Sequence, residues 1–153
     1  MKLQDEIKQT KPFRSVEEEA YLSLVRTAAL LEHSLAQALK DFDITPTQYN
    51  VLSILRGSGP QGLCRNEVGC RLVTAMPDVT RLLDRMEDTG LIVRERGTKD
   101  RRKVATRLTK KGIDLVNRLD AKVLEAHTRQ FRGVDRKSLK ELIAVLGDLR
   151  EPE

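Results

Sequence analysis

The sequence has few aromatic residues. Tryptophan is absent, and aromatic residues make up only 3% of the 153 residues. A hydrophobic core must therefore consist mainly of Leu, Val, Ile and Ala, which favours packed helices over a β-sandwich. The length suits a single domain with a core of its own. We expect a mainly α-helical fold with one domain over residues 1–153.

Cysteine and histidine are also scarce, with two of each. Cys64 and Cys70 are too few for a disulfide framework, and six positions apart on one short helix they would lie on different faces. We expect two reduced thiols, and a response to thiol oxidation through Cys64 or Cys70 is the less favoured alternative. His33 and His127 have no neighbours at the spacing of a metal site. The sequence predicts no metal and no cofactor.

Long apolar runs are missing as well. No run approaches the ~20 residues that a membrane span needs. Asp5 and Glu6 interrupt the position where a signal peptide would have its apolar region. No nucleophile–base arrangement and no Gly-rich phosphate loop is found, which argues against an enzyme. We expect a cytoplasmic protein without a membrane partner.

Positive charge is concentrated in one segment. The chain carries a net charge of +5, but residues 94–111 hold nine Lys/Arg and two acids and so carry +7. The remainder of the chain is therefore slightly acidic. A local basic block of this kind is typical of contact with a polyanion such as DNA.

Long helical patterns lie at both ends of the chain. Apolar residues recur every three or four positions over residues 16–42, with Ser15 and Glu18 as a capping box. Similar patterns predict a helix over 109–131 and a last helix beginning at Asp135. The stripe in 16–42 is long for a small domain and suggests packing against a partner subunit.

Between these helices, residues 45–108 predict a winged helix-turn-helix. Thr45-Pro46-Thr47-Gln48 starts a helix that should end before Gly57. A short helix opens at Cys64 with apolar members to Val73, and after a tight turn another opens at Pro77 and closes at Gly90. Two strands, 91–93 and the alternating run 104–108, then form a hairpin across 97–100.

These elements resemble the MarR family of bacterial transcriptional regulators over nearly the whole chain. The resemblance rests on the helix start at 45–48, the run VTRLLDRME at 79–87, GLI at 90–92, DRR at 100–102 and LTKKG at 108–112. It implies a homodimer whose helical regions, 16–42 and 109–150, interleave. It also implies repression at a pseudo-palindromic operator, relieved by a small phenolic or other anionic ligand or by thiol oxidation.

The recognition helix is predicted at residues 77–89. If its apolar side chains are buried, polar side chains near its N-terminal end point outward to base edges in the major groove. The candidate contacts are Pro77, Asp78, Thr80, Arg81 and Arg85. Ordinary solvated arginines paired with neighbouring acids are the alternative. Met76-Pro77-Asp78 departs from the family's Ser/Thr-rich helix opening, and so does Cys64 from its usual Thr or Ser cap.

The wing is predicted at residues 94–107. A narrow minor groove attracts arginine, and a nearby carboxylate can hold the guanidinium in place. The resemblance identifies Arg102 as the inserted residue, with Asp100 as its support. Arg101 accompanies this pair, and phosphate contacts are expected from Lys99, Lys103 and Arg107.

An effector cleft, where the family has one, lies between the dimer helices and the DNA-binding lobe. Tyr49 is a candidate for its lining because a phenol offers an apolar face and a hydrogen bond, and His33 is a second candidate. A structural tyrosine is the alternative at residue 49. A winged-helix module that binds an acidic protein surface is the alternative for the whole chain.

Overall fold

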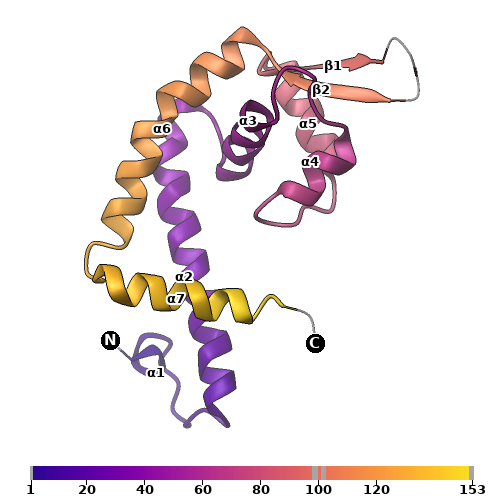
Figure 1. Cartoon of the computed structure of the whole chain (residues 1–153). Helices are drawn as coiled ribbons and strands as arrows, with labels where there is room; N and C mark the ends of the chain where they lie inside the picture. The colour runs from indigo at the N-terminus through magenta and orange to yellow at the C-terminus, as the bar shows by residue number, and fades with distance from the viewer. Residues whose placement is uncertain (1, 98–99, 101–102, 152–153) are drawn as a thin grey trace.

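The chain folds into a winged helix-turn-helix lobe, residues 46–108, carried on a long helical arm (Figure 1). The arm consists of residues 16–42 and 110–148. The computed structural model describes residues 2–97, 100 and 103–151. The helices and strands, in chain order, are α1 (Leu3–Glu6), α2 (Val16–Leu39), the 3-10 turn η1 (Lys40–Phe42), α3 (Pro46–Ser58), α4 (Arg65–Arg71), α5 (Val79–Asp88), β1 (Ile92–Arg96), β2 (Val104–Leu108), α6 (Lys110–Gln130) and α7 (Arg136–Asp148). The fold class predicted from the sequence, mainly α with a β-hairpin wing between long helices, is confirmed.

Helix caps set several of the boundaries. Ser15, Thr45 and Asp135 each accept hydrogen bonds from backbone N–H groups in the first turn of the helix that follows. At Thr45 the cap is reciprocal, because Gln48 Oε1 accepts from Thr45 N at 2.9 Å while Gln48 N donates to Thr45 Oγ1 at 3.1 Å. Such caps satisfy backbone donors that the helix itself leaves unpaired.

The core lies within the lobe and against α6. Its largest fully buried side chains include Leu52 of α3, Leu83 and Met86 of α5, Ile92 of β1 and Leu119 of α6. Helix α2 runs alongside α6 (Figure 1) and buries only Leu39, close to its C-terminal end. The N-terminal part of α2 therefore stays accessible to solvent in the single chain.

The wing is an antiparallel hairpin joined firmly to the helices. Strand β1 pairs with β2 from Ile92 opposite Leu108 to Arg96 opposite Val104. Thr109 then connects α5 to α6, because its Oγ1 donates to Gly90 O at 2.6 Å and accepts from Gly112 N at 3.1 Å. Gly112 is buried so close to Leu91 that a Cβ there would overlap the Leu91 carbonyl oxygen. This contact fixes the base of the wing on α6.

The two helices of the helix-turn-helix are shorter than the sequence predicted. Helix α4 ends at Arg71, and Val73, predicted to be on its apolar face, is 88% exposed. Helix α5 begins at Val79 and not at Pro77, because Asp78 is the residue that caps it. Both differences lengthen the turn between the helices.

The burial along β2 also differs from the prediction. The alternating run 104–108 predicts that Val104 and Thr106 share the inner face of the strand, but Val104 is 38% exposed, and Thr106 is the buried residue of β2. Thr106 is buried because it forms a short antiparallel bridge with Leu63, through backbone hydrogen bonds of 2.7 and 3.0 Å. The alternation along β2 is therefore shaped by a third segment that lies far away in the sequence.

Candidate nucleic-acid interface

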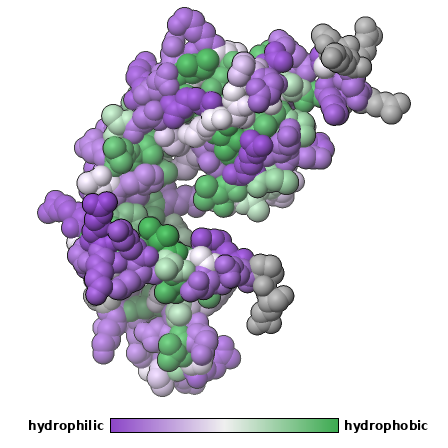
Figure 2. Space-filling view, viewed as in Figure 1, coloured by the Kyte–Doolittle hydropathy of each residue, from purple (hydrophilic) through white to green (hydrophobic). Residues whose placement is uncertain are grey.

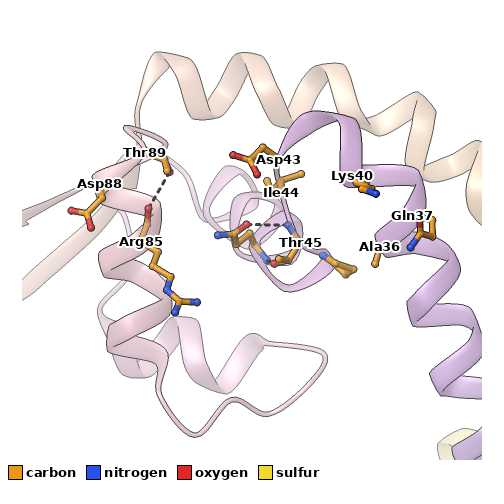
Figure 3. Close-up of a pocket in the computed structure, with 11 residues that line it drawn as sticks. Ala36, Gln37, Lys40, Asp43, Ile44, Thr45, Arg85, Asp88 and Thr89 are labelled. Carbon is orange, nitrogen blue, oxygen red and sulfur yellow. Dashed lines mark hydrogen bonds between the residues drawn. The ribbon is translucent and has the colours of Figure 1, made fainter.

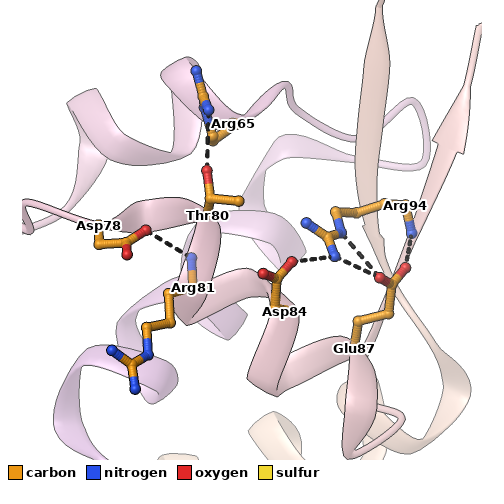
Figure 4. Close-up of polar contacts among 7 residues, drawn as sticks. All are labelled: Arg65, Asp78, Thr80, Arg81, Asp84, Glu87 and Arg94. Carbon is orange, nitrogen blue, oxygen red and sulfur yellow. Dashed lines mark hydrogen bonds and ion pairs between the residues drawn. The ribbon is translucent and has the colours of Figure 1, made fainter.

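Helix α5 has one buried face and one polar face. Leu82, Leu83 and Met86 are buried, whereas Arg81 and Arg85 are exposed. Asp78 Oδ1 accepts a hydrogen bond from Arg81 N at 2.9 Å, so this carboxylate stabilises the start of the helix. Figure 4 shows the Arg81 side chain extending away from the helix near its N-terminal end. That end is where a recognition helix presents side chains to bases.

Thr80 lies on the side of α5 that faces α4. Its Oγ1 accepts a hydrogen bond from Arg65 Nη1 at 3.0 Å (Figure 4). Thr80 is half-buried and Arg65 is exposed. This bond ties the two helices of the helix-turn-helix together and adds a cation beside the N-terminal end of α5. Pro77, just before the cap, is exposed.

Arg94 of β1 clamps the wing to α5. The guanidinium Nη2 donates to Glu87 Oε2 and to Asp84 Oδ1, both at 2.6 Å (Figure 4). Two further hydrogen bonds go to Glu87: Arg94 Nε donates to Oε2 at 3.1 Å, and the backbone N of Arg94 donates to Oε1 at 3.0 Å. The hydrogen bonds from Arg94 lower the pKa of the Glu87 carboxyl. Glu87 therefore stays ionised and the clamp stays closed at neutral pH.

The described part of the wing loop is held by backbone hydrogen bonds. Gly97 N donates to Lys103 O at 2.7 Å, and Lys103 N donates to Asp100 O at 3.1 Å. Asp100 and Lys103 are exposed. Lys99, Arg101 and Arg102 lie outside the described residues, so the predicted support of Arg102 by Asp100 stays a prediction.

Arg107 lies on β2, at the root of the wing. Its Nη1 pairs with Glu95 Oε2 on the neighbouring strand at 3.0 Å, and its Nε donates to Gln61 O at 3.4 Å. A phosphate contact by Arg107 would thus compete with an exposed ion pair, which is a weak competitor.

Tyr49, Arg56 and Asp120 join the lobe to the helical arm. Tyr49 Oη donates to Asp120 Oδ1 at 3.2 Å, and Arg56 donates to both oxygens of Asp120 at 2.7 and 3.0 Å. Arg56 also donates to Asn117 Oδ1 at 2.8 Å. Burial raises the pKa of Tyr49, and the hydrogen bonds from Arg56 lower the pKa of Asp120. The hydrogen bonds from Tyr49 and Arg56 to Asp120 link α3 to α6 and help to orient the lobe on the arm.

The lowered pKa of Asp120 makes this link dependent on pH. Its stabilisation is fully present above the ordinary carboxyl pKa of ~4 and is lost as the pH falls through the lower pKa of the folded state. We expect the melting temperature of the native protein to exceed that of Asp120→Asn by a constant amount above pH ~5, and this difference to shrink towards pH ~3. Thermal unfolding at a series of pH values measures it, and parallel curves throughout would contradict the link.

A cleft of about 580 Å³ lies between the arm and the lobe. Figure 3 shows Gln37 and Lys40 on the side of α2, and Arg85, Asp88 and Thr89 on the side of α5. Thr45, Pro46 and Gln48, at the start of α3, also line it. The two effector candidates lie elsewhere: Tyr49 contacts Asp120, and His33 is exposed on α2.

The cysteines and acidic residues suggest no further centre. Cys64 is half-buried at the start of α4, Cys70 is exposed, and both are free thiols. Glu67 Oε2 accepts from Cys64 N at 2.7 Å, which caps the start of α4. Within residues 2–97, 100 and 103–151, no cluster of His, Cys, Asp and Glu could hold a metal ion. No helix in these ranges is long and apolar enough to cross a membrane.

Comparison with known proteins identifies the family. The sequence model of the MarR family matches residues 44–104. Over 139 residues the chain is 32% identical to the HTH-type transcriptional regulator YkoM of Bacillus subtilis (strain 168), with 88% of each chain covered. The chain belongs to the MarR family. It is a MarR-family DNA-binding transcriptional regulator and not an enzyme.

Solved MarR structures agree with this fold. A MarR transcription factor from Planctomyces limnophilus is 36% identical, with a TM-score of 0.68 over 89% of this chain and 98% of that chain. MepR of S. aureus, solved as a complex with DNA, is 27% identical, with a TM-score of 0.76 over 84% of this chain and 95% of that chain.

Several residues of this MarR protein escaped the sequence reasoning. They are Arg65, Glu87 and Arg94 in the lobe, Arg56 and Asp120 between lobe and arm, and Lys40 at the cleft. A signal existed for Arg94, since it is the first basic residue of the strand that follows the acids of α5. Helical spacing is equally consistent with the alternative that the acids of α5 pair with Arg81 and Arg85 on the same helix.

Proposed function

We propose that this MarR-family regulator is a homodimeric repressor of a pseudo-palindromic operator. Each subunit would place α5 in the major groove and the β1–β2 wing in the adjacent minor groove. The observation that carries the proposal is the geometry of α5, whose inner face is buried while Arg81 and Arg85 are exposed on its outer face. Pro77, Asp78 and Thr80 lie at the end that would meet the bases.

The wing supplies the second half of the contact. Lys103 and Arg107 are exposed there, and Asp100 with Arg101, Arg102 and Lys99 complete the basic hairpin of the sequence. Because arginine is favoured in narrow minor grooves, Arg102 is proposed as the inserted residue. The lysines and Arg107 would meet phosphates and add affinity without sequence information.

Dimerisation is supported by the apolar surface of the arm. Helix α7, Arg136–Asp148, is described in full and contains no buried residue. Ile143 of this helix and Leu149, directly after it, are each 66% exposed. Tyr21 and Val25 of α2 are likewise exposed, at 65% and 51%. Exposed apolar side chains that gather on neighbouring helices are typical of a protein interface. A second copy of the chain would cover these side chains and hold the two lobes at the spacing of the two operator half-sites.

DNA selection tests the repressor. Purified protein should enrich an inverted-repeat sequence from a randomised duplex library, and its affinity should fall steeply with salt, by a log–log slope of about −0.9 per neutralised phosphate. A reporter gene behind the enriched site should be transcribed less in cells that make the protein. The proposal is wrong if no sequence is preferred over random duplex at ~0.15 M salt.

We also propose that an anionic aromatic effector binds the cleft between arm and lobe. Lys40 of the arm and Arg85 of α5 line it together with the acids Asp43 and Asp88, and the cleft is the size of a small-ligand pocket. A carboxylate or phenolate held between the two cations would tie α5 to the arm. Since Arg85 would then be turned away from DNA, binding of the effector would release the operator.

Substituting Lys40 tests the effector site. A panel of benzoate, 4-hydroxybenzoate and salicylate is titrated into the complex of the protein with its selected duplex. Loss of one charge-assisted hydrogen bond should raise the concentration needed for release by about tenfold or more in Lys40→Gln. Lys137→Gln, an exposed lysine of α7, is the control and should release like the native protein. Equal release from both variants would exclude the cleft.

A further inference from the structure

The turn between α4 and α5 exposes apolar side chains where a DNA-binding lobe is expected to be polar. It contains Val73, Ala75, Met76 and Pro77, all exposed, and no Lys or Arg between Arg71 and Arg81. Val73 is 88% exposed and Met76 is 36% exposed. In Figure 2 an apolar patch lies on the lobe over the end of this turn.

The turn is held in place at both ends. Val73 N donates to Asn50 Oδ1 of α3 at 2.9 Å, which fixes the exit from α4. Asp78 caps α5 at the other end. Gly69 lies so close to Val79 that a Cβ there would stand 3.3 Å from Val79 Cγ2, so α4 and α5 pack tightly behind the turn. The apolar side chains are thus presented from a constrained backbone.

Three arginines lie close to this apolar surface in the sequence or in the structure. Arg65, Met76, Pro77 and Thr80 line a cleft of about 680 Å³ that opens beside the N-terminal end of α5. Arg71 and Arg81 flank the turn on either side and are exposed. An apolar surface between arginines is unusual for a ligand that is apolar throughout. It suits a ligand with phosphates at its edges and an apolar group between them.

The major groove of DNA has one such apolar group, the C5 methyl of thymine. Resting on the DNA-docking mode proposed above, we propose that Met76 determines sequence specificity by packing against a thymine methyl beside the position that Arg81 contacts. Val73 and Pro77 border the same contact. The operator half-site then contains a required thymine at the N-terminal end of α5, recognised by burial of its methyl group without a hydrogen bond.

Replacing thymine by deoxyuridine tests this contact, because it removes only the methyl group. The probe is the duplex selected from the randomised library, with the thymines of one half-site replaced one at a time. Binding of the full chain should weaken by about three- to tenfold at one or two of them, as burial of a single methyl group implies. The other replacements should have little effect.

The Met76→Ala variant then tests whether Met76 is the side chain that contacts the thymine methyl group. It should bind the unmodified duplex more weakly and no longer distinguish thymine from deoxyuridine at that position. Ile113→Ala removes a similarly exposed apolar side chain from α6 and should keep the native preference. Thermal unfolding confirms that both variants are folded.

Three results would overturn the inference. They are a deoxyuridine scan without any penalty, a penalty that persists in Met76→Ala, and a change of subunit association in that variant in place of a change in preference. A protein that selects no sequence at all would instead refute the repressor proposal. The two failures are therefore distinguishable.

Discussion

Ile143→Glu is expected to convert the dimer to a monomer and to weaken operator binding by at least about 100-fold. The Ile143 side chain is 66% exposed on α7 in the single chain, on the same face as Leu139 and Leu146. A carboxylate there would be buried without a partner in the dimer, which is strongly unfavourable. Once the subunits separate, the second lobe no longer binds at a high effective concentration, and linked sites of this kind commonly gain 10²–10⁴ in affinity.

Sedimentation velocity and fluorescence anisotropy with the selected duplex measure both effects. Ala144→Glu is the matched control, because it adds the same charge one residue further, about 100° around the helix and away from the apolar face. That variant should remain dimeric and bind normally. A monomeric Ile143→Glu protein with native affinity would show that one lobe binds the operator alone.

Arg94→Met is expected to weaken DNA binding by about 10- to 50-fold and to lower the stability of the lobe by about 1–2 kcal/mol. Arg94 is the common partner of Asp84 and Glu87. Without it, two carboxylates on α5 lose their counter-charge and face the DNA phosphates. The wing also loses its fixed position relative to α5, so the two elements no longer enter neighbouring grooves together.

Arg96→Met separates these effects from simple loss of charge. Arg96 is exposed on the same strand, and the change removes the same charge. It should lessen the salt dependence of binding slightly and leave the melting temperature unchanged, whereas Arg94→Met should lower both affinity and melting temperature. If the two variants behave alike, Arg94 contributes charge alone and the clamp has no positioning role.

The sequence determined the elements of this protein because their signals are local. Ser15, Thr45, Thr109 and Asp135 each cap a helix through hydrogen bonds that span two or three residues. Hydrophobic periodicity is equally local, and so the order of the elements, the fold class and the family could be predicted. The basic block at residues 94–111 located the wing in the same way.

Only the tertiary structure decided which charges meet and which apolar side chains stay exposed. Arg56 meets Asp120 across 64 positions, and Lys40 lines a cleft with Arg85, so no spacing rule could pair them. Val104 and Thr106 share one face of β2, yet the bridge from Leu63 buries Thr106 while Val104 stays exposed. From the sequence alone, Met76 is only a departure from the family's helix opening. Its exposure depends on Asp78 capping α5 and on Asn50 holding Val73, since a side chain's surroundings are set by segments that meet only after folding.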